Sequence, residues 1–215
     1  MKDRDTQVKV KICGMTNLND VKVAVDGGVD AVGFIFYKKS PRSVTMQTVR
    51  EIVLELPPFV DSVGVFVDET AEQINKIADR CNLDRVQLHG DESPAFCKKI
   101  RRRVIKAIRV KDIQSLKKLS DYPVSSFLLD TFSEDQYGGT GKVFDWNLAF
   151  PAKRYGPIIL AGGLTPNNVR QAIQRIQPYG VDVCSGVESQ PRIKDHKKMQ
   201  AFLKNVKAGR KYESP

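Results

Sequence analysis

The sequence lacks the features that mark membrane proteins and disulfide-stabilised secreted domains. No apolar run approaches the roughly 20 residues that a membrane span needs. The opening segment, residues 1–5, is charged and leads into a strand-like stretch, so the apolar core of a signal peptide is missing. The four cysteines stand apart without CxxC spacing, which argues against a disulfide framework. We therefore expect a cytoplasmic protein with reduced thiols and no membrane partner.

Metal-binding and nucleotide-binding patterns are missing as well. The chain holds only two histidines, His89 and His196, and its cysteines lack the paired spacing of a zinc site, so no metal is expected. No GxGxxG follows the first strand-like stretch, so the dinucleotide fingerprint is absent. A net charge of +10 favours anionic partners. The basic clusters lack interleaved stacking aromatics, however, so no nucleic acid is expected.

What the chain does contain is a repeated strand–turn–helix pattern. Short β-branched runs alternate with longer stretches whose apolar residues lie three and four positions apart. The predicted strands cover residues 8–12, 31–36, 62–67, 85–88, 104–108, 127–129, 157–160 and 181–184. The predicted helices cover residues 18–26, 47–56, 71–81, 94–100, 113–119, 145–149, 166–176 and 195–208. Thr16 or Asn17 is expected to cap the first helix.

Eight such units with continuously apolar strands predict an α/β fold, a single-domain (β/α)8 TIM barrel. The competing architecture, an open doubly wound sheet, needs a switch point and usually has fewer units. We assign residues 1–208 to the barrel and residues 209–215 to a polar C-terminal tail. In a barrel, function is sought at the carboxyl ends of the strands and in the loops that follow them.

Two glycine-bearing loops follow the last two predicted strands. Gly162 and Gly163 come after the seventh strand, and Ser185 and Gly186 come after the eighth. Glycine lets backbone amides approach a ligand closely, and in barrels these two loops frequently form a phosphate site. Either loop alone is explained equally well by a tight turn. Together, at these strand ends, they favour phosphate.

Cys13 and Asp130 are candidates for acid–base chemistry. Cys13 ends the first predicted strand, where a thiol can act as base or nucleophile once its pKa falls below about 8.5. A lone cysteine is more often an inert core residue. Asp130 directly follows the sixth predicted strand and is expected at the mouth of the barrel, because an unpaired buried charge is costly. There it can serve as a general acid or, equally, as an acceptor for loop amides.

Three further side chains are candidates for substrate contacts. Arg42, in the loop after the second strand, carries a planar donor fork suited to a carboxylate, although most loop arginines are simply solvated. Gln87 and His89 stand at the end of the fourth strand and can face the mouth of the barrel. His89 is explained equally well as a turn residue.

Eight segments, in order along nearly the whole chain, resemble one enzyme family. They are KICGMTN, DAVGFIF, SPRSV, VGVFV, VQLHGDE, LLDT with GGTGKVFDW, AGGLTPNNV and DVCSGVES. This set resembles N-(5′-phosphoribosyl)anthranilate isomerase of tryptophan biosynthesis. The resemblance implies an Amadori-type rearrangement of an aminoaldose that gives 1-(2-carboxyphenylamino)-1-deoxyribulose 5-phosphate, with no metal and no cofactor.

The resemblance also implies a role for individual residues. Asp130 would protonate the furanose ring oxygen as general acid, and Cys13, as thiolate, would take the C2′ proton as general base. Arg42 matches the arginine that holds the anthranilate carboxylate. The expected substrate-binding set is Arg42, Gln87, His89, Gly141, Gly162, Gly163, Asp182, Ser185 and Gly186. Cys184 stands where the family commonly has a serine, and a thiol is the poorer hydrogen-bond donor, so no side-chain contact to phosphate is assigned to it.

Three other interpretations stay open. An aminoaldose isomerase of histidine biosynthesis, or a dual-substrate version, is expected to use two carboxylates in place of the thiol–carboxylate pair. Indole-glycerol-phosphate synthase shares the barrel but needs a lysine–glutamate set that has no place here. A non-catalytic nucleic-acid-binding barrel would rest on the +10 charge alone. The expected partner is a small phosphorylated anthranilate–ribose substrate, and the expected assembly is a monomer or a homodimer.

Overall fold

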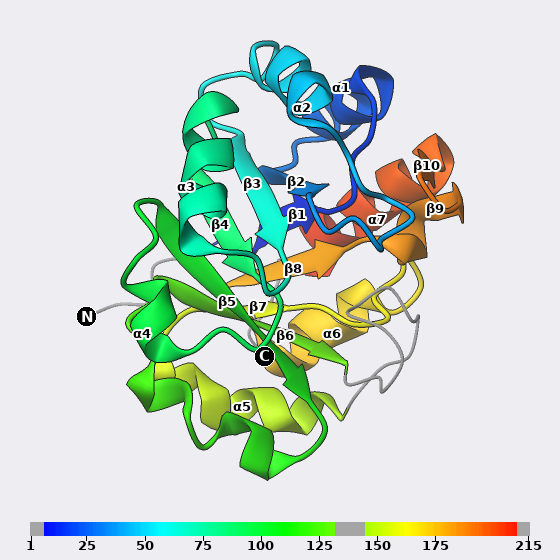
Figure 1. Cartoon of the computed structure of the whole chain (residues 1–215). Coiled ribbons are helices and arrows are strands. Elements are labelled where there is room, and N and C mark those ends of the chain that lie inside the picture. The colour runs from blue at the N-terminus through cyan, green and yellow to red at the C-terminus, as the bar shows by residue number, and fades with distance from the viewer. Residues whose placement is uncertain (1–6, 132–144, 210–215) are drawn as a thin grey trace.

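The computed structural model describes residues 7–131 and 145–209, and eight of their strands form a closed parallel barrel (Figure 1). Each strand pairs with the next along the chain, and β8 closes the barrel by pairing with β1. The barrel strands are β1 (Lys9–Ile12), β2 (Ala31–Ile35), β3 (Asp61–Phe66), β4 (Arg85–Leu88), β5 (Arg103–Val110), β6 (Ser126–Thr131), β7 (Ile158–Leu160) and β8 (Gly180–Val183). The predicted TIM barrel is therefore confirmed.

The strand side chains divide into an inner and an outer set, because successive residues of a strand point to opposite faces. The inner set packs as a small cluster of buried residues: Val63, Ile105, Ala107, Leu128, Ile159 and Ala161. The outer set packs against the surrounding helices in one large apolar core that includes Ile12, Phe127 and Val181. Asp130 lies two residues beyond Leu128, so it shares the inner face of β6.

The helices lie outside the strands, as Figure 1 shows. They are α1 (Leu18–Asp26), α2 (Met46–Val53), α3 (Ala71–Arg80), α4 (Pro94–Cys97), α5 (Ala149–Ala152), α6 (Val169–Ile176) and α7 (His196–Gly209). Asn17 caps α1 by accepting a hydrogen bond from the Asp20 backbone N–H at 2.9 Å, which is one of the two caps that the sequence predicts. In the described part of the chain, no helix is long and apolar enough to cross a membrane.

The structure departs from the predicted elements in four places. The helix predicted over 113–119 is replaced by two short 3₁₀ turns, η1 (Ile113–Leu116) and η2 (Leu119–Asp121), and α4 stops after one turn. The segment predicted as a helix over 145–149 is mostly the 3₁₀ turn η3 (Trp146–Leu148), which leads into α5. Two more 3₁₀ turns are η4 (Lys153–Tyr155) and η5 (Ser185–Val187). An antiparallel hairpin, β9 (Glu188–Gln190) and β10 (Ile193–Lys194), follows β8 and was not predicted. The boundary at residue 208 stays a prediction, because the residues after Gly209 lie outside the described ranges.

Candidate active site

A cavity of about 480 Å³ opens at the carboxyl ends of the barrel strands. This volume lies within the range of about 300–1,000 Å³ that holds small-molecule ligands. The candidate residues of the described ranges all line it: Cys13, Arg42, Gln87, His89, Asp130, Gly162, Gly163, Asp182, Ser185 and Gly186. Gly141, the remaining candidate, lies outside the described residues. The structure thus gathers side chains from six strand ends around one space.

An ion pair inside the barrel supports the floor of this cavity at the junction of β1 and β8. Lys11 Nζ donates to Asp182 Oδ1 at 2.9 Å, and both side chains are buried. Burial raises the pKa of Asp182 to about 6, although the nearby Lys11 charge opposes the rise. Burial also works against the Lys11 ammonium, but Asp182 and Cys13 outweigh it and raise the pKa of Lys11. Lys11 is therefore a permanent positive charge beneath the site.

Cys13 extends β1 into the cavity and is held there by its backbone N–H, which donates to Val183 O at 2.8 Å. Gly33 makes room for the thiol: a Cβ at that position would lie 2.8 Å from Cys13 Sγ and 3.0 Å from Lys11 Nζ. The pKa of Cys13 is lowered by a hydrogen bond with Cys184, which together with the Lys11 charge outweighs the effect of burial. The site therefore favours a thiolate at Cys13.

Asp130 lies within β6 and not after it, which corrects the expected strand end. Asp130 is only 6 % exposed, and the burial of its carboxyl group is compensated by two hydrogen bonds. The Thr131 backbone N–H donates to Oδ1 at 2.8 Å, and His89 Nε2 lies 3.1 Å from Oδ2. An unpaired buried charge would be costly, but a carboxyl group with these partners is not.

His89 links Asp130 to Gln87. Gln87 Nε2 lies 3.0 Å from His89 Nδ1, and His89 Nε2 lies 3.1 Å from Asp130 Oδ2, so both ring nitrogens of His89 have a partner. Gln87 Oε1 is buried without a hydrogen-bond partner in the described part of the chain. His89 thus contacts the carboxyl group directly, and the turn-residue interpretation is incomplete.

The two glycine-bearing loops meet at the cavity, where Gly162 lies next to Asp130 and Thr131. Gly162 and Gly163 adopt φ of +76° and +66°, a backbone conformation that favours glycine. At Gly186 an added Cβ would lie 1.9 Å from Leu164 O, so the loop after β8 packs directly against the loop after β7. The Asn168 side chain, which donates to Gly163 O at 2.9 Å, fixes the β7 loop to the start of α6. The two loops thus border one region of the cavity.

Arg42 lies at the edge of the cavity in an ion pair with Glu188 on the β9–β10 hairpin. The hydrogen bonds with Glu188 raise the pKa of Arg42, and the group stays charged. Glu188, Lys194 and Lys11 are site residues that the sequence analysis missed. Glu188 stands in the quoted DVCSGVES segment, so a signal for it was present. Lys11 lies among apolar strand residues, and a strand pattern does not tell which lysine finds a buried partner.

Comparison with known proteins gives one consistent result. A sequence profile described as N-(5′phosphoribosyl)anthranilate (PRA) isomerase matches residues 10–205. The chain belongs to this family. The N-(5′-phosphoribosyl)anthranilate isomerase of Geotalea uraniireducens is 54% identical over 199 residues, which cover 93% of this chain and 98% of that protein.

Solved structures of PRA isomerases agree with the fold. The phosphoribosyl anthranilate isomerase of Thermotoga maritima matches with a TM-score of 0.88 at 45% identity, covering 94% of this chain and 99% of that one. A phosphoribosyl anthranilate isomerase in complex with reduced 1-(o-carboxyphenylamino)-1-deoxyribulose 5-phosphate matches with a TM-score of 0.85, at 45% identity and the same coverage. The family assignment thus rests on sequence and on backbone geometry.

Proposed function

We propose that this PRA isomerase family member converts N-(5′-phosphoribosyl)anthranilate to 1-(2-carboxyphenylamino)-1-deoxyribulose 5-phosphate. The observation that carries the proposal is the placement of a thiol and a carboxyl group, Cys13 and Asp130, in one cavity with separate features for two anionic groups. Arg42 and the loops bearing Gly163 and Gly186 all line this cavity. A substrate with a carboxylate at one end and a phosphate at the other has the matching chemistry.

In the first step Asp130 acts as the general acid and gives a proton to the furanose ring oxygen. The bond from this oxygen to C1′ breaks, and the nitrogen lone pair forms a C=N bond, which yields an iminium ion. His89 is the residue placed to orient Asp130, through the contact of 3.1 Å. Acid catalysis of this kind contributes about 10²- to 10⁴-fold to the rate.

In the second step the Cys13 thiolate takes the proton from C2′. The electrons of the C–H bond form a double bond between C1′ and C2′, and the iminium is reduced to an enolamine. The enolamine then tautomerises to the 2-keto product. The lowered pKa of Cys13 supports this role, because a base must be unprotonated before it acts. The iminium accepts the electrons itself, so the scheme needs neither a metal nor a cofactor.

The finer properties of the protein are part of the same proposal. The substrate is a small phosphorylated molecule with an anthranilate group, and neither a nucleic acid nor a membrane is a partner. Four free cysteines support a reducing compartment such as the cytoplasm. The assembly is a monomer or a homodimer, which sedimentation equilibrium distinguishes.

The test is the loss of phosphoribosylanthranilate fluorescence when purified protein is added to substrate generated in situ, without added metal. Wild type should consume the substrate and Cys13→Ser should not, because a hydroxyl titrates too high to act as a base near neutral pH. Cys81→Ser is the matched control, since Cys81 follows α3, does not line the cavity and donates to Met46 O at 3.6 Å. An inactive wild type would refute the substrate assignment, and full activity in Cys13→Ser would remove this thiol from the mechanism.

A further inference from the structure

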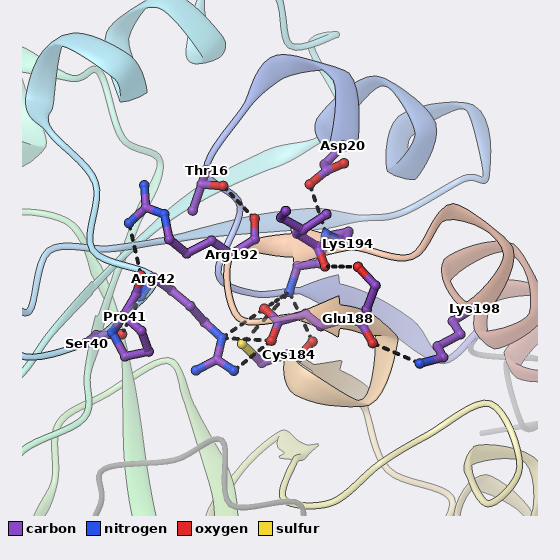
Figure 2. A network of polar contacts seen from close by, with 12 residues as sticks. Thr16, Asp20, Ser40, Pro41, Arg42, Cys184, Glu188, Arg192, Lys194 and Lys198 are labelled. Carbon is purple, nitrogen blue, oxygen red and sulfur yellow. Dashed lines mark hydrogen bonds and ion pairs between the residues drawn. The ribbon is translucent and has the colours of Figure 1, made fainter.

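The β9–β10 hairpin lies outside the barrel, yet it contacts the loop that carries Arg42 at two levels (Figure 2). One contact is made to the Arg42 side chain and the other to the backbone on either side of it. The hairpin follows β8 directly, and it was not predicted from the sequence. Its contacts bear on how a carboxylate is recognised.

The side-chain contact is a forked ion pair between Arg42 and Glu188. Arg42 Nε lies 2.8 Å from Glu188 Oε1, and Arg42 Nη2 lies 2.7 Å from Glu188 Oε2. This arrangement occupies the Nε–Nη2 side of the guanidinium. Within the described residues Nη1 has no hydrogen bond, so the Nη1–Nη2 end remains as a second fork for a carboxylate. Glu188 therefore fixes the guanidinium plane without using all of its donors.

The positive charge of Lys194 offsets the negative charge of Glu188, so Glu188 does not cancel the charge of Arg42. Its buried Nζ lies 3.0 Å from Glu188 Oε1 and donates to Cys184 O at 3.0 Å. Arg42, Glu188 and Lys194 together carry one net positive charge. Burial works to raise the pKa of Glu188, but Arg42 and Lys194 outweigh it and the pKa is lowered, so the carboxylate stays ionised. An incoming anion therefore still meets a positive potential.

The backbone contact comes from Arg192 at the tip of the hairpin. Its Nη1 donates to Pro41 O and to Ser43 O, each at 2.9 Å, and these carbonyls flank Arg42. Thr16 Oγ1 in turn donates to the Arg192 carbonyl at 2.8 Å. Arg192 has φ of +78°, a conformation that costs energy for any residue other than glycine. The hairpin thus holds the Arg42 loop by its main chain as well as by its side chain.

We propose that Glu188, Arg192 and Lys194 are positioning residues, which hold the Arg42 fork in the orientation that selects a substrate carboxylate. This inference rests on the proposed function, since it assigns the specificity of the same site. The competing hypothesis is that Glu188 masks Arg42 and must be displaced by the substrate. The two hypotheses differ in sign: loss of Glu188 weakens carboxylate binding in the first and strengthens it in the second.

The experiment compares two ligands by isothermal titration calorimetry. One is reduced 1-(2-carboxyphenylamino)-1-deoxyribulose 5-phosphate, and the other is the same molecule without the ring carboxylate. The proteins are wild type, Glu188→Gln, Arg192→Gly and the control Glu55→Gln. Glu55 is exposed and lies after α2, so its variant makes the same charge change away from the cavity. Arg192→Gly removes the two hydrogen bonds to the Pro41 and Ser43 carbonyls, and glycine readily adopts the positive φ at this position. This second variant keeps the hypothesis testable if Glu188→Gln does not fold.

Wild type and Glu55→Gln should bind the carboxylated ligand more tightly, and in Glu188→Gln this preference should fall by about tenfold, which is the factor that 1.4 kcal/mol represents. In Arg192→Gly the preference for the carboxylated ligand should fall by a smaller factor. In turnover the loss should appear as a raised KM with kcat little changed. An unchanged preference in both variants, or a stronger one in Glu188→Gln, would overturn the inference while leaving the isomerase assignment standing. Failure of wild type to bind either ligand would instead refute the proposed function.

Discussion

Replacing Cys184 with alanine should move the titration of the Cys13 thiol to higher pH. The hydrogen bond between these two residues is the largest influence that lowers the pKa of Cys13, and burial opposes it. The same hydrogen bond, with burial, raises the pKa of Cys184, so Cys184 keeps its proton and is the donor. Loss of this donor removes stabilisation from the thiolate alone, and the pKa of Cys13 must rise.

The size of the shift follows from the strength of one hydrogen bond to a charged group. A hydrogen bond to a charged group contributes about 1.5–3 kcal/mol, and the lower end of this range applies because a thiol is a weak donor. One pKa unit corresponds to about 1.4 kcal/mol, so the expected rise is about one unit. The base acts only when ionised, so kcat/KM increases as the pH rises through the pKa of Cys13. In Cys184→Ala this limb of the pH profile should therefore lie about one unit higher. Cys184→Ser supplies a stronger donor, so in this variant the same limb should lie at or below its wild-type pH.

The direct assay is the rate of alkylation of Cys13 by iodoacetamide as a function of pH, followed by mass spectrometry of the Cys13 peptide. It reports the thiolate without requiring turnover. Cys97→Ala is a suitable control, because Cys97 is a buried residue of α4 outside the cavity. An alkylation midpoint in Cys184→Ala that equals the wild-type midpoint would refute the reasoning, and Lys11 would then be the principal source of the lowered pKa.

Two further predictions concern the acid and the phosphate loops. Asp130→Asn should lower kcat by about 10²-fold or more with KM little changed, because an amide cannot supply the proton. Steady-state kinetics measures both constants. If the variant turns over as fast as wild type, another residue must be the acid. Gly186→Ala places a Cβ within 1.9 Å of Leu164 O, so the loops must separate. Its affinity for inorganic phosphate as a competitive inhibitor should fall by about tenfold or more, the loss expected when one charge-assisted contact is removed. Unchanged inhibition would show that phosphate binds elsewhere.

The barrel could be predicted because its determinants are local. Each strand carries its own apolar run, each helix its own period, and β4 over Arg85–Leu88 agrees with its predicted bounds. The alternation of side chains along a strand also predicts part of the site, since it places Asp130 on the same face of β6 as the inner-core residue Leu128. The segment predicted as a helix over 113–119 forms two 3₁₀ turns instead, and only Leu116 of η1 and Leu119 of η2 are buried, which is less than the apolar stripe of an amphipathic α-helix.

The residues that tune the site could not be predicted because their partners are distant in sequence. Lys11 and Asp182 are separated by 171 positions, and Arg42 and Glu188 by 146. A lysine in a short strand is usually an exposed residue, and only closure of the barrel between β1 and β8 gives this one a buried partner. The strands of the hairpin, three and two residues long, are too short to give a periodic signal.

The junction of β1 and β8 is where fold and chemistry depend on each other. Pairing of these strands aligns Lys11 with Asp182 in register and brings the segments that end in Cys13 and Cys184 side by side. The buried charges of Lys11 and Asp182 are costly unless they are paired with each other. The cost is met only when the barrel is closed, and the same pairing lowers the pKa of Cys13. Hence the lowered pKa of Cys13 depends on the pairing of β1 with β8.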